Sequence, residues 1–230
     1  MKFLFFILFS LSGILFGFAQ ETVVKDVDSL YKEDQFYAGV TYNLLVNKPK
    51  DVSQNGFSLG FHLGIIKDIP LNKKRNVAIG IGLGYSANSF IQNILINKNN
   101  VGDFEYTVLD DSNSFSKNKY SNHLLEVPIE FRWRTSTPTN YNFWRIYTGF
   151  KFGCVFSNTT QYQGDLGNLS YTDNKDFNKF QYGLTLSAGY NTWNIYMYYA
   201  LNPVFSKDTQ LNGGNLEINE VKVGLMFYIL

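Results

Sequence analysis

The feature that most constrains this chain is a two-residue alternation of apolar with small or polar side chains, which recurs in eight stretches. In residues 180–190 the even positions, such as Phe180 and Leu184, are apolar or aromatic, whereas odd positions such as Gln181 and Ser187 are polar or small. This is the period of an extended strand with one apolar and one polar face. Repeated stretches of about ten residues predict an all-β fold, an eight-stranded antiparallel up-and-down transmembrane β-barrel.

The links between these stretches alternate between long loops and short turns, as expected when all loops leave one end of a barrel and all turns leave the other. Segment 67–76 is the exception, because it is long for a turn. An even number of strands is expected to place both termini on the periplasmic side. The predicted strands cover residues 35–44, 57–66, 77–91, 121–134, 143–157, 178–190, 193–204 and 217–230.

The first residues have the pattern of a cleaved secretory signal peptide. Lys2 supplies a positive start, an apolar run follows, and Gly17-Phe18-Ala19 offers small residues for cleavage. We therefore expect a signal peptide at 1–19, a short periplasmic segment at 20–34 and an outer-membrane barrel domain at 35–230. No later apolar run has the length of a membrane-spanning helix. The expected location is the bacterial outer membrane.

Alternation alone does not say which face lies inside, because a soluble lipocalin-like barrel has the same period with its apolar face inward. The polar face of 77–91 carries Ala78, Gly80, Gly82 and Gly84, where a water-exposed strand would carry lysine or glutamate. Small residues suit the narrow lumen of a membrane barrel of eight strands. The tryptophans all fall beside predicted periplasmic turns, which predicts an aromatic girdle at the membrane interface, made of Trp133, Trp144 and Trp193.

Charged residues recur on the predicted inward faces. Because charges removed from water must be paired, we expect a lumenal salt-bridge network. Its expected role is to fill the barrel and fix strand register, and a path for protons or ions is the functional alternative. Inward-facing Tyr147, Tyr196, Tyr198 and Tyr228 predict a closed interior without an open pore. The predicted network consists of Glu126, Glu130, Arg132, Arg134, Arg145, Lys151, Glu220 and Lys222.

The composition argues against several other functions. The net charge of +1 lacks the basic excess that nucleic acid binding requires. The single cysteine, Cys154, allows neither an internal disulfide nor a cysteine-based metal cluster. No motif in the chain predicts a metal site or a cofactor. The repeat Gly80-x-Gly82-x-Gly84 lies within a strand and lacks the following helix of a phosphate-binding loop.

Enzymatic activity is not predicted either. His62 falls on an inward strand face and is expected to be a hydrogen-bonded filler. His123 lies at the outer end of the strand at 121–134, near an acidic loop, where a carboxylate–histidine pair is conceivable. Neither spacing nor a motif supports a catalytic site there. The acids of this loop are Asp103, Glu105, Asp110 and Asp111.

Loop 92–120 leaves two interpretations open. Its aromatic residues Phe104, Tyr106 and Phe115 lie among acids and would suit an exposed partner interface. Alternatively, the flanking strands extend beyond the membrane as a hairpin around residues 104–110 and bury these rings locally.

Several segments resemble the PorT-like family of outer-membrane β-barrels. The most specific is Leu124-Leu-Glu-Val-Pro-Ile-Glu-Phe-Arg-Trp133, whose Pro128 would by itself predict a bulge or argue against a strand. Similar patterns occur in Asp34-Gln-Phe-Tyr-Ala-Gly-Val-Thr-Tyr42, Gly80-Ile-Gly-Leu-Gly-Tyr85 and Val221-Lys-Val-Gly-Leu-Met-Phe227.

This resemblance implies an integral outer-membrane protein with a structural or assembly role in type IX protein secretion, and in the gliding or surface-protein export that depends on it. The partners it implies are outer-membrane lipid and protein components of an envelope secretion complex. The family offers no catalytic or ligand residues to carry over. The alternative function is that of a small non-enzymatic barrel for adhesion or envelope integrity.

Overall fold

The computed structural model describes residues 33–54, 56–110, 112–135 and 143–229. The predicted signal peptide, and the predicted periplasmic segment apart from Glu33 and Asp34, lie outside the described residues. No helix within these described ranges is both long and apolar enough to cross a membrane.

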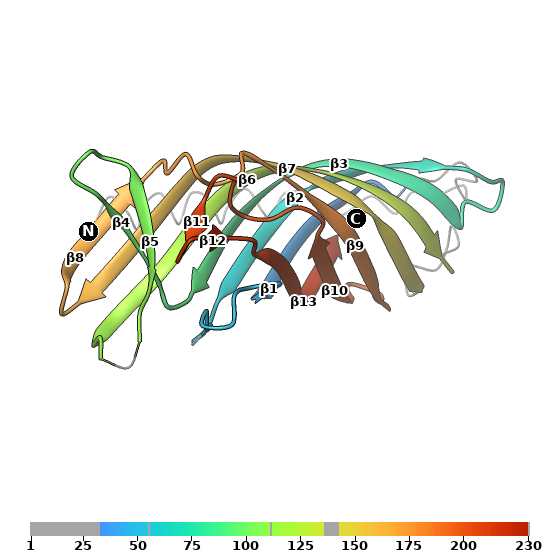
Figure 1. Cartoon of the computed structure of the whole chain (residues 1–230). Helices are drawn as coiled ribbons and strands as arrows, with labels where there is room; N and C mark the ends of the chain where they lie inside the picture. Colours follow the sequence, from blue (N-terminus) through green and yellow to red (C-terminus); the bar gives the residue numbers. More distant parts are fainter. Residues whose placement is uncertain (1–32, 55, 111, 136–142, 230) are drawn as a thin grey trace, which may run out of the picture. The chain divides into compact units, whose positions relative to one another are not determined.

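Eight strands form a closed antiparallel ring. Neighbours in the ring follow the order β6-β3-β2-β1-β13-β10-β9-β7, and β7 pairs back with β6, so the ring has no free edge (Figure 1). The predicted eight-stranded all-β barrel is therefore confirmed. The strands are β1 (Gln35–Val46), β2 (Leu59–Pro70), β3 (Val77–Ile91), β6 (Phe115–Arg134), β7 (Trp144–Gly164), β9 (Phe180–Tyr190), β10 (Trp193–Ala200) and β13 (Asn219–Ile229).

The apolar strand faces point away from the interior. Leu184 and Phe150 are 44% and 49% exposed, whereas Gln181 and Thr185, on the opposite face of β9, are both 4% exposed. A soluble barrel requires the reverse, with apolar residues inside and polar residues in water. The prediction that the apolar face is the outer one is confirmed.

Strand β2 runs further than the alternation indicated. It continues through Lys67 and Asp68 to Pro70, so the connection to β3 is only 71–76 instead of the predicted 67–76. The predicted strand boundary was wrong because charged residues near a strand end resemble a turn. Alternation continues through them, and Asp68 lies on the same inward face as His62. Strand β10 shows the opposite error, because it ends at Ala200 rather than at 204.

Pro128 is accommodated without a bulge. The ladder between β3 and β6 keeps one register on both sides of it but omits the pair Gly82–Pro128 and the adjacent pair Leu83–Val127. Pairing with β7 continues without interruption at Pro128 and Lys151. The absent proline N–H is therefore tolerated on the β3 side, where Gly82 has no side chain to meet the ring.

Strands β6 and β7 extend well beyond the outward apolar band. The outer face of β6 is apolar from Leu125 to Trp133 and polar from His123 back to Lys117. These nine residues span about 30 Å along a strand, or a little over 20 Å in height at a tilt of about 40°. Such a height matches the apolar band of a barrel in a membrane, which is about 25 Å. The remainder of both strands projects past the band, beyond a bulge that leaves Phe156 without a partner in β6.

A cap covers this end of the barrel. It contains the hairpin β4 (Ile94–Lys98) and β5 (Phe104–Val108), the strand β8 (Gly167–Thr172) on β7, and the short pair β11 (Gln210–Leu211) and β12 (Gly214–Asn215) (Figure 1). Aromatic rings hold it together. Phe90 stacks on Tyr120 at 4.7 Å between centroids, and Phe205 packs against Tyr106 at 5.5 Å.

The aromatic residues of loop 92–120 agree with the interpretation that the flanking strands extend as a hairpin and bury these rings. Tyr106 is buried in the cap, Phe104 packs edge-on against Tyr171, and Phe115 packs against Tyr162. The loop is a hairpin between extended strands, and its rings stabilise the cap rather than form an open interface.

A glycine of β3 leaves room for the side chain of Tyr37, which reaches over β2 from β1. A methyl group at Gly84 would meet the hydroxyl of Tyr37 and lie 2.9 Å from the carbonyl oxygen of Leu63. Because β3 is pinned between β2 and β6, its backbone has little freedom to retreat. Glycine is thus required here by close approach.

We therefore expect Gly84→Ala to lower the free energy of unfolding by about 1–3 kcal/mol, through overpacking against Tyr37. Urea unfolding of the protein in detergent micelles measures this change. Gly214→Ala is the matched control, because its new methyl group meets only the Leu211 carbonyl oxygen, at 3.7 Å. Equal stability of the two variants would contradict the close packing of the lumen.

Candidate functional site

Among the described residues, ten charged side chains are buried in the barrel interior and at its turn end. Five are cationic and five anionic, so the interior has no net fixed charge when His62 is neutral. The eight residues predicted as a lumenal network are all in this set. The set is Arg132, Arg134, Arg145, Lys151, Lys222, Glu33, Asp68, Glu126, Glu130 and Glu220.

The densest cluster lies toward the turn end and centres on Asp68. Its Oδ1 accepts hydrogen bonds from Nη1 of Arg132 at 3.0 Å and from Nη1 of Arg134 at 2.8 Å, and its Oδ2 accepts one from Nη2 of Arg134 at 2.7 Å. Glu130 lies 3.3 Å from Nε of Arg132, and Glu33 lies 3.4 Å from Nε of Arg134. One carboxylate thus joins two guanidinium groups, one of them in bidentate geometry.

A second cluster occupies the middle of the lumen. The carboxylate of Glu126 lies 3.0 Å from the Lys151 ammonium and 3.7 Å from Nδ1 of His62, and it accepts a hydrogen bond from the Ser86 hydroxyl at 2.8 Å. On β13, Glu220 and Lys222 point to the same side and pair at 3.0 Å. Nine of the ten buried charges therefore have an opposite charge in direct contact, which is the arrangement that a water-poor interior requires.

Arg145 differs from the other members of the predicted network. Seven of the eight form ion pairs, whereas no acid lies within ion-pair distance of Arg145 among the described residues. Its guanidinium group lies over the ring of Phe143 at 4.5 Å and near the rings of Tyr147 and Tyr228, at 5.9 and 5.8 Å. Aromatic faces thus provide a cation–π environment for it.

Two residues of the network were not predicted. Asp68 could have been found by continuing the alternation of β2, because it is even-numbered like His62, which faces inward. Glu33 precedes the first strand, and no sequence pattern marked it as part of the interior. Together with Glu130 they supply the negative charge beside Arg132 and Arg134 at the turn end.

Tyrosines fill most of the remaining space. Tyr37, Tyr147, Tyr196, Tyr198 and Tyr228 are all buried in the lumen, with Tyr147 and Tyr228 packed edge-on at 5.3 Å. Paired charges and rings thus occupy the cross-section of the barrel. The arrangement favours a structural filler over an ion path.

The two histidines lie in different surroundings. His62 is in hydrogen-bond contact with the Thr41 hydroxyl at 3.1 Å, in addition to its contact with Glu126. His123 lies on the outer face, where its Nδ1 is 2.7 Å from the Tyr85 hydroxyl and its ring contacts Phe156. Within the described residues, no contact joins His123 to Asp103, Glu105 or Asp110. Asp111 lies outside them.

The three tryptophans gather on the outer face at the turn end of the barrel. Trp144 and Trp193 flank Tyr190, which pairs with both in the ladder, and Trp133 pairs with Ile146 on the same side. All three rings are exposed, at 39% for Trp133, 61% for Trp144 and 63% for Trp193. This is the placement that an interfacial girdle requires.

The family model described as outer membrane protein beta-barrel domain matches residues 18–206 of the chain. No curated protein matches the chain. Among solved structures, Ail, the attachment invasion locus protein of Yersinia pestis, in complex with the heparin analogue sucrose octasulfate, has a TM-score of 0.40 at 13% identity. A second crystal structure of Ail has a TM-score of 0.33 at 11% identity. In both cases the match covers 87% of this chain and 100% of the Ail chain.

Because Asp68 holds two buried arginines, we expect Asp68→Asn to lower the free energy of unfolding by about 3–5 kcal/mol, the cost of breaking a buried ion pair from one side. Urea unfolding in detergent micelles is the measurement. Asp103→Asn, at an exposed acid of the cap, is the control and should change stability by less than about 0.5 kcal/mol. A loss for Asp68→Asn as small as the control's would show that the cluster contributes little.

The filled lumen predicts that the purified protein does not form stable channels in planar lipid bilayers. A sixteen-stranded porin in the same bilayer serves as the positive control, because its lumen is an aqueous channel. Reproducible large conductance steps from the protein would contradict the closed interior.

Proposed function

Since the chain belongs to the outer membrane protein beta-barrel domain family and is an outer-membrane β-barrel, we propose that it has a structural or assembly role in type IX protein secretion. In this role it serves the gliding or surface-protein export that depends on secretion. The resemblance of residues 124–133 and 221–227 to PorT-like barrels supports the choice of this process.

The observation that carries the proposal is the filled and charge-balanced lumen. A barrel whose interior is occupied by ion pairs and tyrosines offers no route for a folded or unfolded cargo. Such a protein acts through its surfaces, by binding other components of an envelope assembly. The candidate surfaces are the cap at one end and the exposed basic turn with Lys73 and Lys74 at the other.

We place the turns and both strand termini on the periplasmic side. Phe36 at the start of β1 pairs with Ile229 at the end of β13, so the two ends of the barrel sequence meet at the turn end. Short turns toward the periplasm and long loops toward the exterior are the usual arrangement of outer-membrane barrels. In this orientation the cap faces the cell exterior, and the short turns face the periplasm.

The proposed role is non-enzymatic. His62 is enclosed among ion-paired groups, and His123 is engaged with Tyr85 on the outer face. His62 does contact the Thr41 hydroxyl and the Glu126 carboxylate, but all three groups are buried in the filled lumen, where a substrate has no access, and His123 contacts a tyrosine hydroxyl instead of a carboxylate.

A second candidate function is adhesion or envelope integrity without a part in secretion. The observation that favours it is the projection of β6, β7 and β8 past the apolar band, with a polar outer face. A rigid polar sheet held outside the membrane is suited to contact with surfaces or matrix.

Deletion of the gene separates the two candidates. We expect the deletion strain to lose type IX substrates from its culture medium and to retain them in the cell, as measured by quantitative proteomics of both fractions. A plasmid copy of the gene is the control and should restore export. Normal export combined with weakened adhesion or envelope leakage would replace the secretion role with the second candidate.

A further inference from the structure

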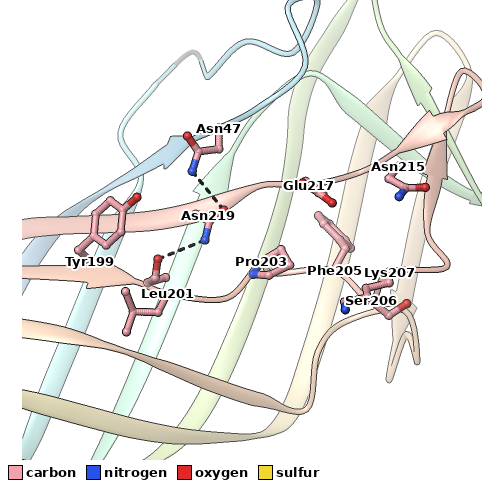
Figure 2. A pocket seen from close by; sticks show the side chains of 11 residues that line it. Asn47, Tyr199, Leu201, Pro203, Phe205, Ser206, Lys207, Asn215, Glu217 and Asn219 are labelled. Carbon is pink, nitrogen blue, oxygen red and sulfur yellow. Dashed lines mark hydrogen bonds between the residues drawn. The ribbon is translucent and has the colours of Figure 1, made fainter.

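A polar slot of about 410 Å³ lies on the outside of the cap (Figure 2). One wall is the chain that leaves β10, residues 199–207, and the other is the chain that enters β13, residues 215–219, with Asn47 at one end. Its volume is in the range of small-ligand sites, which is about 300–1,000 Å³. The slot is separate from the barrel lumen and from the network described above.

The position of the slot relative to the apolar band is informative. Along β10 the outward residues run from Trp193 through Ile195 and Met197 to Tyr199, and Leu201 follows just past the strand. Tyr199 and Leu201 line the slot and are 38% and 43% exposed. The slot therefore begins where the lipid-facing column ends, at the level where tyrosine is favoured in membrane proteins.

Hydrogen bonds fix the walls in place. The Asn47 amide donates to Oδ1 of Asn219 at 3.4 Å, and the Asn219 amide donates to the Ala200 carbonyl at 3.1 Å (Figure 2). Beneath them, the Val204 N–H donates to the Ile218 carbonyl at 2.7 Å and ties the two chains together. A site held by its own framework has little ordering cost on binding.

Two charged side chains of the slot have no partner within the described part of the chain. Lys207 and Glu217 are exposed, form no ion pair and lie more than 4.0 Å from each other's charged groups. A lysine ammonium is a point charge suited to phosphate. The carboxylate of Glu217 can accept hydrogen bonds from hydroxyl groups. The amide of Asn215, which also lines the slot, can donate hydrogen bonds to them.

We propose that this slot binds the phosphorylated saccharide headgroup of a glycolipid in the outer leaflet, with Lys207 on a phosphate and the Asn215–Glu217 side on sugar hydroxyls. The acyl chains run down the lipid-facing column below Tyr199 and Leu201. A free sugar phosphate would leave that apolar border unused, and the headgroup of phosphatidylethanolamine has no hydroxyl groups for the polar wall. The inference rests on the proposed orientation, with loops outside, but not on the role in secretion.

The test uses the full barrel in detergent micelles and purified bis-phosphorylated lipid A as the probe, with retained lipid counted by native mass spectrometry. We expect one lipid A per barrel. We expect Lys207→Ala to weaken its affinity about tenfold, as for loss of a charged contact, and Glu217→Gln to weaken it less. Lys175→Ala is the matched control, because Lys175 is an exposed lysine outside the slot. Retarded mobility on heating before electrophoresis verifies that each variant is folded.

Two further probes identify what is recognised. Dephosphorylated lipid A should bind the wild-type protein about as weakly as lipid A binds Lys207→Ala. Phosphatidylethanolamine should compete poorly. Equal affinity of Lys207→Ala and Lys175→Ala for lipid A would overturn the site, and equal competition by phosphatidylethanolamine would overturn the glycolipid assignment. Lipid A binding in micelles is independent of secretion. A failure to bind lipid A would therefore leave the secretion proposal intact, and normal export in the deletion strain would leave the lipid A site intact.

Discussion

Closure of the hydrogen-bonded ring is the constraint on which the rest of the structure depends. In a bilayer, each unpaired backbone N–H or carbonyl group costs several kcal/mol, so a spanning sheet must have no edge. Here the pairings of β1 with β13 and of β6 with β7 close the ring. With eight strands, closure leaves an interior only wide enough for side chains, and those side chains must then satisfy one another.

Most charged side chains of the interior meet this requirement by pairing with an opposite charge rather than by apolar packing. Asp68 pairs with two arginines and Glu126 pairs with Lys151, so that opposite charges meet in direct contact. Gly84 of β3 allows the ring of Tyr37 from β1 to lie along the inner wall of the barrel, over Gly64 of β2. A buried network of this kind is weak evidence for high stability, but its geometry is specific. A one-residue slip of β6 would turn Arg132 toward the membrane, so the network also fixes the register.

The alternation in the sequence was sufficient to predict the ring and its strand count. The outward direction of the apolar face also required the small residues of 77–91 and the position of the tryptophans beside the turns. The alternation failed where local chemistry resembles a turn. The charges of Lys67 and Asp68 led to a predicted end of β2 that was too early. Asp68 was therefore not predicted to face inward, although it is the centre of the arginine cluster. Glu33 could not be found because its role depends on a chain path before β1 that has no periodic pattern. As a general rule, proline disfavours a strand that has two neighbours. Pro128 is an exception because of Gly82, which is distant in sequence and adjacent only in the folded sheet.

The two ends of the barrel are closed by different interactions, and the difference follows from their surroundings. At the turn end the lumen is closed by side chains that the barrel wall encloses. The dielectric constant is low there, so well-formed ion pairs between Asp68 and arginines are strong. The cap lies beyond the apolar band, where exposed ion pairs contribute little and burial of apolar surface is effective. There Phe90, Tyr120 and Phe205 form the seal. Because aromatic packing holds the cap from within, its outer surface is left free to carry polar groups. Lys207 and Glu217 are of this kind, since both are exposed and neither forms an ion pair within the described ranges.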